Sequence, residues 1–231
     1  MNKIIGKSNP KLCASVICTN LLNIEKDLDI LEEERFDYLH FDIMDGRFVQ
    51  RLGLDLTLLK KITSKYLIPV EVHLMVENPI KYIEEVVKAG AKAIVFHLEN
   101  KININNLIYK IKEYKNIKIG LALKPNTPIN LIIPYLDLID IVLLMAYPPG
   151  TFGKKPKKNL EKRIYSLSKL LSKYKKENVD VAIDGGVTIK NLKSYLDSGA
   201  SMFIFGTSGL FIKRIDIRDQ IKLIKKTLNI I

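Results

Sequence analysis

The chain has 231 residues, is 47% hydrophobic and carries a formal net charge of +12 at pH 7. This length accommodates one or two domains, and single α/β barrels of this size are ordinary. No uninterrupted apolar stretch of about 18 residues occurs, so a membrane span is not expected, and the polar residues 1–11 lack the apolar core of a secretory signal.

Segments typical of strands recur along the chain from Leu12 onward. The sequence predicts strands over residues 12–16, 38–44, 69–75, 93–97, 118–123, 139–145, 179–184 and 201–206. The segment 139–145 is almost entirely apolar, as expected for a strand that is buried on both faces of a parallel sheet.

Apolar residues at helical spacing follow most of these strands. They are Ile24, Leu28 and Leu31; Leu56, Leu59 and Ile62; Leu107, Ile108 and Ile111; and Ile164, Leu167 and Leu171. A short helical segment is expected after residues 125–128, and a last helix from about residue 215 to 228.

Two helices carry end signals. The better marked has Asn78 as a candidate N-cap, Pro79 in its first turn and Gly90 at its end. The other is expected to begin at a capping Thr188 and to end at Gly199.

Eight strand-then-helix units predict an α/β fold, a single (β/α)8 TIM barrel, with residues 1–231 forming one domain. The competing architecture is an open doubly wound sheet. That fold usually carries a glycine fingerprint after its first strand, and residues 15–20 contain no glycine.

The segment 38–44 is expected to place polar, chemically reactive side chains inside this barrel. Successive strand side chains point to opposite faces, so His40, Asp42 and Met44 share one face and the apolar residues between them share the other. A buried carboxylate is costly unless it is paired or bound to a metal. Partners for Asp42 are therefore expected elsewhere in the chain.

Active sites of such barrels lie at the carboxyl ends of the strands. His40, Asp42, His73 and Asp184 all fall at predicted strand ends and can form one site. Imidazole with carboxylate suits Zn²⁺, and also Fe²⁺, Mn²⁺ or Co²⁺. The spacing does not choose among these ions.

Asp42 and Asp184 would reach the site from nearly opposite sides of the barrel. Two carboxylates on opposite faces of a substrate carbon can remove a proton from one face and return it on the other, which is the geometry of an epimerase acting through an enediolate. A bound cation would weaken a ligating Asp as a base. The same cation must therefore acidify the substrate C–H bond by binding the adjacent oxygens.

Glycines cluster late in the chain, at Gly150, Gly153, Gly185, Gly186 and Gly206. Loops after the last strands of these barrels often hold a phosphate on backbone N–H groups. One end of a substrate would then be a phosphate, and the other would meet His and Asp side chains.

Several of these residues also have ordinary structural interpretations. His40 alone would be a hydrogen-bonded interior histidine, and Asp184 followed by two glycines would be a turn. His97, which precedes Glu99 by two residues, is interpreted as structural. Met44, Met75 and Met145 are core fillers by default, although at three strand ends they can form an apolar floor against a planar intermediate.

Charge and cysteine content bear on partners and compartment. The excess of positive charge is interpreted as a general bias of the composition toward lysine, because no stacking aromatics interleave with the basic residues. No nucleic-acid or membrane partner is therefore expected. Lys154–Lys158 is the exception and could steer an anionic substrate. Cys13 and Cys18 lack companions at zinc-motif spacing, and a reducing, cytoplasmic location fits them.

Four segments together resemble the ribulose-phosphate 3-epimerase family: residues 40–46 (HFDIMDG), 72–75 (VHLM), 142–145 (VLLM) and 184–187 (DGGV). The resemblance extends from about residue 12 to 211. It implies a metal-dependent interconversion of D-ribulose 5-phosphate and D-xylulose 5-phosphate, in the pentose phosphate pathway. His40, Asp42, His73 and Asp184 would be the metal ligands, with Asp42 and Asp184 as the acid/base pair.

The resemblance also implies where the substrate binds and how the protein assembles. Family members are usually homo-oligomers, often dimers. The expected substrate-binding residues are Ser15, Met44, His73, Met75, Met145, Gly150, Thr151, Phe152, Gly153, Gly185, Gly186, Gly206 and Thr207.

Two loops depart from the family pattern. The loop after the sixth strand commonly reads Pro-Gly-Phe-Gly-Gly-Gln, and residues 149–154 read PGTFGK here. After Asp45-Gly46 the family commonly has His-Phe-Val-Pro-Asn, and residues 47–51 read RFVQR. Both differences leave the four metal residues intact and bear on lid closure, phosphate affinity and turnover.

Two other functions remain open at this stage. One is a related phosphosugar epimerase acting on a hexulose 6-phosphate, since substrate length is not encoded in these motifs. The other is a catalytically weak barrel that binds polyanions, which the net charge of +12 suggests.

Overall fold

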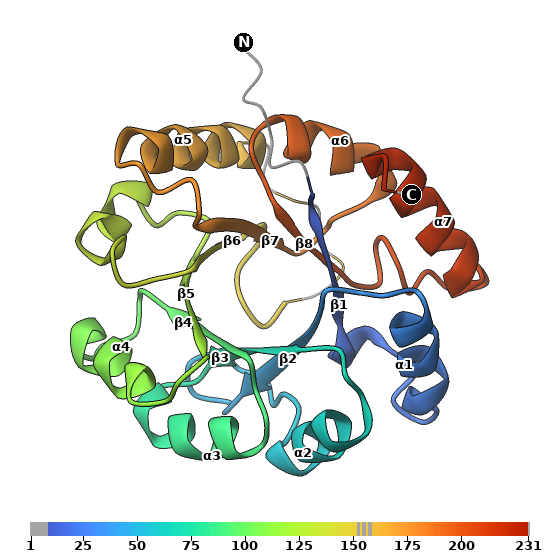
Figure 1. Cartoon of the computed structure of the whole chain (residues 1–231), viewed down its shortest axis with the longest axis horizontal. Helices are drawn as coiled ribbons and strands as arrows, with labels where there is room; N and C mark the ends of the chain where they lie inside the picture. Colours follow the sequence, from blue (N-terminus) through green and yellow to red (C-terminus); the bar gives the residue numbers. More distant parts are fainter. Residues whose placement is uncertain (1–8, 152, 154–155, 157–158, 231) are drawn as a thin grey trace.

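Eight parallel strands close into a barrel in a computed structural model that describes residues 9–151, 153, 156 and 159–230. Each strand pairs with its sequence neighbours, and β1 also pairs with β8. Figure 1 shows the helices as a ring outside the strands. The strands are β1 (Lys11–Ser15), β2 (Tyr38–Met44), β3 (Val70–Met75), β4 (Ala93–His97), β5 (Lys118–Leu123), β6 (Ile141–Met145), β7 (Asp180–Asp184) and β8 (Met202–Phe205). The closed order confirms the (β/α)8 barrel and excludes the open sheet.

The outer ring consists of α-helices and, after β5, a 3₁₀ segment. Pro134 lies inside that segment, and a proline interrupts the hydrogen bonding of a regular α-helix. The α-helices are α1 (Ile24–Glu33), α2 (Leu56–Lys65), α3 (Ile83–Lys88), α4 (Ile104–Lys112), α5 (Leu160–Lys173), α6 (Ile189–Asp197) and α7 (Ile217–Leu228), and the 3₁₀ segments are η1 (Val16–Cys18), η2 (Pro79–Tyr82) and η3 (Ile129–Tyr135).

Strand alternation separates two apolar regions. Leu39, Phe41 and Ile43 point outward from β2 and join the large core between the strands and the helices. A second cluster lies inside the barrel and includes Val95 and Leu143. Both regions are buried, so the barrel is packed from within and the side chains at its strand ends are held in place.

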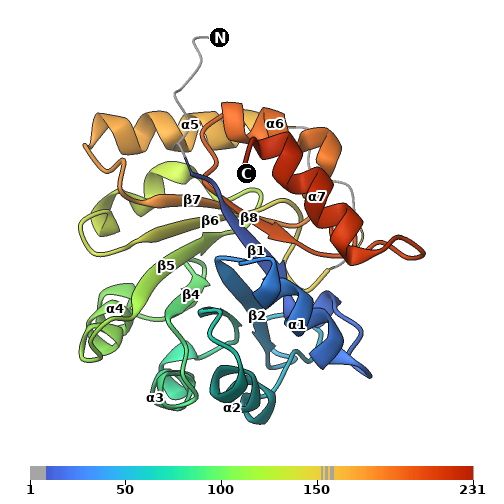
Figure 2. The same cartoon turned by 45° about the vertical axis from the view of Figure 1, so that its right-hand side comes forward.

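The first and last helices meet on one side of the barrel. Figure 2 shows α1 and α7 beside β1. Lys225 of α7 donates to Glu34 at 2.7 Å, and Arg218 pairs with Glu33. Among the described residues, none of the helices combines the length and apolar character needed to cross a membrane.

One of the two predicted helix N-caps is confirmed and the other is not. Thr188 caps α6 in a capping box with Asn191, as expected. Asn78 makes no side-chain cap, and the chain forms the 3₁₀ turn η2 before α3 begins at Ile83. The prediction of an Asn78 cap was therefore wrong. Gly90 follows α3 with a φ of +97°, a conformation that favours glycine.

The strand boundaries shifted by one or two residues in five of the eight strands. Val16 begins η1 and does not belong to β1, and residues 139–140 precede β6. Strand ends fray into turns, so apolar pattern locates a strand better than its terminal residues.

Candidate active site

Strands β2 and β3 set the centre of the site through their register. Asp42 lies opposite His73, and Met44 lies opposite Met75. Because the two strands run parallel with matching alternation, His40 and Asp42 project to the inside together with His73. Both histidines are fully buried, and Asp42 is 4% exposed.

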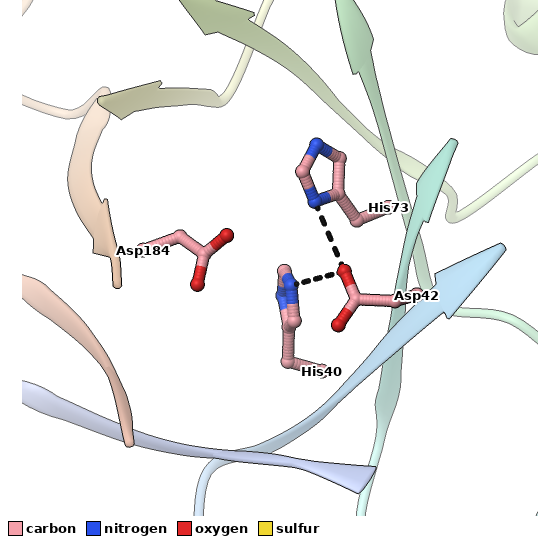
Figure 3. Close-up of side chains that lie close together, drawn as sticks. All are labelled: His40, Asp42, His73 and Asp184. Carbon is pink, nitrogen blue, oxygen red and sulfur yellow. Dashed lines mark hydrogen bonds and ion pairs between the residues drawn. The ribbon is translucent and has the colours of Figure 1, made fainter. Parts of the chain in front are cut away.

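Barrel closure brings Asp184 from the end of β7 to the same point. One ligand atom from each of His40, Asp42, His73 and Asp184 lies within 4.8 Å of the others. Figure 3 shows these four side chains turned toward one another inside the barrel. His40 Nε2 is 3.1 Å from Asp42 Oδ1, and His73 Nδ1 is 3.3 Å from the same oxygen. The four residues expected to share one site therefore do so.

A buried carboxylate behind His40 was not anticipated from the sequence. His40 Nδ1 lies 2.5 Å from Glu71 Oε2, and Glu71 is 1% exposed. A carboxylate in this position holds the ring so that Nε2 faces the other three residues. The signal was available, because alternation along β3 places Glu71 on the same face as His73, one layer deeper in the barrel.

A second pair lies behind His73. The Nε2 atoms of His73 and His97 are 3.1 Å apart, and His97 Nδ1 is 3.0 Å from Glu99 Oε2. Burial, only partly offset by Glu99, lowers the pKa of His97 to about 4. Burial would raise the pKa of Glu99, but hydrogen bonds from His97, Thr127 and the Lys124 N–H outweigh it and lower that pKa to about 2.

The environments of the two aspartates push their pKa values apart. Burial alone would raise the pKa of Asp42, but the adjacent His40 and His73 lower it well below its usual range. Burial raises the pKa of Asp184, and the negative charge of Asp42 adds to that effect against the opposing His40. The two carboxyl groups, although they meet at one centre, therefore differ in how strongly their surroundings favour the ionised form.

The chemistry of the four side chains fits a divalent ion. Two imidazoles and two carboxylates form a donor set suited to Zn²⁺ or a similar first-row metal. His73 Nδ1 is buried and has no hydrogen-bond partner, although it faces Asp42. A buried polar atom without a partner is costly, and a metal bond at this nitrogen would satisfy it.

A cleft opens above these residues at the carboxyl ends of the strands. Of the residues expected to bind substrate, it is lined by Ser15, Met75, Met145, Gly150, Thr151, Gly185, Gly186, Gly206 and Thr207, together with Asp42 and Asp184. Met44 packs against Met75 just beside it. Gly153 is absent from the described lining, and Phe152 lies outside the described residues, as do Lys154, Lys155, Lys157 and Lys158.

The cleft also contains residues that the sequence did not single out for this role: Cys18, Tyr147, Ile204 and Ser208. Tyr147 packs against Gly185, where an added Cβ would lie 2.6 Å from the ring. Burial raises the pKa of Tyr147 above its ordinary value, so the phenol stays protonated. None of the four belongs to a motif, and only the folded loops place them together.

Comparison with known proteins gives a consistent result. A model of the ribulose-phosphate 3 epimerase family matches residues 11–211. Ribulose-phosphate 3-epimerase of Aquifex aeolicus is 34% identical, over 82% of this chain and 83% of its own, and that of Schizosaccharomyces pombe is 32% identical, over 86% of each. The structure of N-(5′-phosphoribosyl)anthranilate isomerase from Pyrococcus furiosus aligns with a TM-score of 0.68 at 13% identity, covering 96% of this chain and 100% of the other. At that identity the similarity concerns the fold alone.

Proposed function

The chain belongs to the ribulose-phosphate 3 epimerase family and is an epimerase, and from that premise we propose a two-carboxylate reaction at C3 of its substrate. The reaction interconverts D-ribulose 5-phosphate and D-xylulose 5-phosphate. The observation that carries this proposal is the meeting of Asp42 and Asp184, from strands β2 and β7, within 4.8 Å of each other and of two imidazoles.

The two aspartates exchange roles between the two directions of the reaction. One carboxylate removes the C3 proton from one face of the sugar, which leaves a planar enediolate. The other carboxyl group then donates a proton to the opposite face, so the configuration inverts. The environments of the two groups support this division, because His40 and His73 outweigh burial and lower the pKa of Asp42, while burial raises that of Asp184.

The ion bound by His40, Asp42, His73 and Asp184 would supply Lewis-acid stabilisation of the negative charge that develops on the sugar oxygens. Zinc is our proposal for the purified protein, with iron, manganese or cobalt as substitutes that the same donors accept. His40 and His73 contribute rings already oriented by Glu71 and His97. Met75 and Met145 supply an apolar surface that excludes water from the planar intermediate.

The phosphate of the substrate would bind at the other end of the cleft. Gly186 and Gly206 offer backbone N–H groups there, and Gly186 precedes the N-terminus of α6. Thr207 and Gly150 lie on neighbouring loops of the same rim. A phosphosugar fits this cleft, since its two ends require an anion site and a metal site.

We further propose that residues 1–231 act as one domain, in a cytoplasmic homodimer or larger homo-oligomer without nucleic-acid or membrane partners. These statements follow the family and the absence of a zinc-motif or disulfide pattern in the sequence. Gel filtration with light scattering tests the assembly.

The decisive experiment compares Asp42→Asn and Asp184→Asn with the wild type in a coupled assay on D-ribulose 5-phosphate. Each substitution keeps the shape of the side chain but removes its proton-transfer capacity, so kcat should fall by about 10²–10⁴-fold. Asp197→Asn is the matched control, because Asp197 lies at the far end of α6 and pairs only weakly with Lys193 at 3.4 Å. During turnover in D₂O, deuterium should enter C3.

Retention of full activity by both active-site variants would rule out the two-carboxylate mechanism. Turnover without incorporation of deuterium would rule out proton abstraction altogether. Faster turnover of a hexulose 6-phosphate would reassign the substrate. Nucleic-acid binding that weakens steeply with salt, in a protein without epimerase activity, would favour the polyanion-binding alternative.

A further inference from the structure

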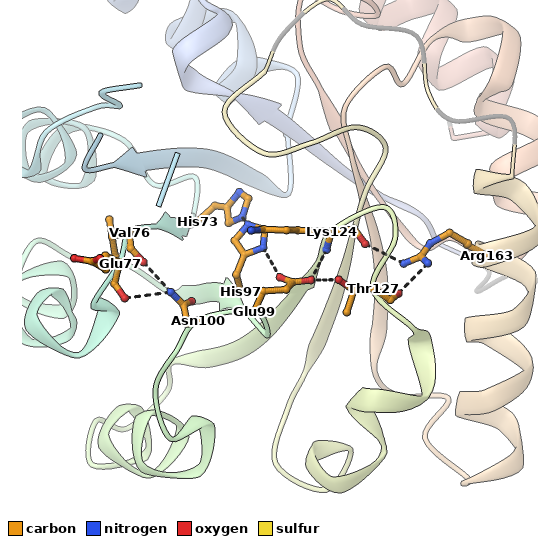
Figure 4. Close-up of polar contacts among 9 residues, drawn as sticks. All are labelled: His73, Val76, Glu77, His97, Glu99, Asn100, Lys124, Thr127 and Arg163. Carbon is orange, nitrogen blue, oxygen red and sulfur yellow. Dashed lines mark hydrogen bonds and ion pairs between the residues drawn. The ribbon is translucent and has the colours of Figure 1, made fainter. Parts of the chain in front are cut away.

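His97 and Glu99 form a hydrogen-bond chain behind His73 that the proposed reaction does not use. Figure 4 shows the order His73, His97, Glu99 and then the turn that carries Lys124 and Thr127. His73 and His97 are fully buried, and the Glu99 side chain is 19% exposed. The chain therefore runs from the metal-type residues to the loop after β5 with little access for water.

The direction of this chain is set at Glu99. Its Oε1 accepts hydrogen bonds from the Lys124 N–H at 2.8 Å and from the Thr127 hydroxyl. Its Oε2 is 3.0 Å from His97 Nδ1. Because an ionised carboxylate only accepts hydrogen bonds, His97 must carry its proton on Nδ1.

The next contact is fixed from the metal side. An imidazole binds a metal through a bare nitrogen, so a neutral His73 whose Nδ1 faces Asp42 and the metal site carries its proton on Nε2. That Nε2 lies 3.1 Å from His97 Nε2, and two bare nitrogens or two N–H groups cannot bond to each other. His73 Nε2 therefore donates to a bare His97 Nε2, which agrees with the proton that Glu99 places on His97 Nδ1.

We propose that Glu99 and His97 are positioning residues that fix the tautomer of His73, so that the lone pair of its Nδ1 points into the metal site. This inference rests on the proposed metal-dependent function, but it concerns the positions of protons on the His73 and His97 rings. It gives His97 a specific role where the sequence suggested only a structural one. The two ligating rings are then oriented by different carboxylates: Glu71 directly behind His40, and Glu99 through His97 behind His73.

The far end of the chain is fixed by the backbone. Arg163 of α5 donates to the carbonyls of Thr127 at 2.9 Å and Lys124 at 3.3 Å. The turn is thus held so that its donors face Glu99 and not solvent. Because those donors are an N–H and a hydroxyl, they reinforce the carboxylate as an acceptor and cannot reverse the chain.

Packing alone is the alternative explanation for His97. Its ring lies 5.1 Å from that of His73 and 4.8 Å from that of Phe48, measured between centroids. A packing role requires a ring of the right size but no particular proton position. The two explanations therefore differ in what an isosteric change at Glu99 does.

Glu99→Gln is the sharpest test. Glutamine has a single carbonyl oxygen, which should turn toward the two donors of Lys124 and Thr127. Its NH₂ group then faces His97 Nδ1 and forces that nitrogen to accept. The chain reverses, and a proton moves onto His73 Nδ1, where it competes with the metal. We expect metal affinity to fall by about 10–100-fold.

The proton positions can be read directly in the metal-free protein. The chain has three histidines, and His40, His73 and His97 account for all of them. Nitrogen-15 labelling of histidine therefore gives a small set of ring signals that distinguish protonated from bare nitrogens. The wild type should show His73 protonated on Nε2 and bare on Nδ1, and Glu99→Gln should show the reverse. Zinc affinity is measured in parallel by competition with a chelator.

Lys124→Gln is the matched control. It removes the side-chain charge that lies 4.3 Å from the centre of the Phe48 ring, but the backbone N–H that holds Glu99 survives. The tautomer of His73 should stay as in the wild type, and zinc affinity should stay within about twofold.

A wild-type protein with its proton on His73 Nδ1 would overturn the proposal, as would a Glu99→Gln variant with unchanged tautomer and zinc affinity. The wild-type spectrum keeps the test decisive even if the variant fails to fold. Failure of the proposed function looks different: the wild type would bind no divalent ion, while the tautomer in the metal-free protein would still be as proposed.

Discussion

At the scale of single residues, the two-residue alternation of a strand predicts which side chains face the barrel interior. Alternation correctly predicted that His40 and Asp42 face the barrel interior, and the cost of burying a carboxylate correctly predicted partners for Asp42. The same alternation places Glu71 in the interior. It was not among the predicted site residues, because those were sought at the carboxyl ends of the strands and Glu71 lies one layer deeper. Contacts across strands, such as that between His73 and His97, depend on register, which a sequence does not display.

Asp45 offers a test at the same scale. Its carboxylate accepts from the backbone N–H groups of Arg47 at 2.9 Å, Phe48 at 3.0 Å and Glu77 at 2.8 Å, joining the loops after β2 and β3. Partial burial would raise its pKa, but these N–H groups outweigh that effect and lower it below 3.8. A lowered pKa contributes stability that is present above the ordinary value and lost as pH falls toward the folded-state value.

We therefore expect Asp45→Asn to reduce the free energy of unfolding by about 1 kcal/mol at pH 7. The difference from the wild type should shrink as pH falls below about 4, because the wild-type carboxylate then protonates as well. Urea unfolding at both pH values measures this, with Asp197→Asn as the control. An undiminished difference in acid would show that the carboxylate charge is not responsible.

At the scale of elements, loops after the strands build the cleft, and the sequence predicted their conformation only in part. The glycines at 185, 186 and 206 correctly marked the loops beside it. The partner of one of them did not follow from any pattern: Tyr147, from the loop after β6, fills the space over Gly185. Local signals thus located the turn, while its packing required the whole barrel.

Gly185→Ala tests this contact. Gly185 has a φ of +100°, and an alanine Cβ would lie 2.6 Å from the Tyr147 ring, so both backbone and ring must shift. Because this loop forms one wall of the cleft, we expect kcat/KM to fall by about ten- to hundredfold.

Gly90→Ala is the matched control for that variant. Gly90 has a φ of +97° and would meet Thr63 at 2.7 Å, but it lies between α3 and β4, away from the cleft. Both variants should lose about 1–3 kcal/mol of stability, and only Gly185→Ala should lose activity beyond that. Equal kinetic losses would attribute the effect to general destabilisation.

At the scale of the whole molecule, closure of the barrel brings the two aspartates together. Asp42 and Asp184 are 142 positions apart (184 minus 42), and only closure of β1 against β8 sets both at one centre. The count of strand-then-helix units predicted this closure, because a closed parallel barrel needs eight of them in order. The helix after β5 became the 3₁₀ segment η3, since Pro134 limits regular helix there without disturbing the strand order.

Net charge is the remaining property of the entire molecule that bears on function. At +12, the protein attracts an anionic phosphosugar over a distance comparable to the Debye length, which is about 10 Å at 0.1 M salt and about 3 Å at 1 M. We expect kcat/KM to fall by about three- to tenfold between 0.02 M and 0.5 M salt, with kcat unchanged because the chemistry takes place inside the buried centre. Steady-state kinetics in chloride and acetate salts at equal ionic strength separate screening from competition by one anion at the phosphate end. A kcat/KM that is constant across this range would mean that the positive surface contributes nothing to capture of the substrate.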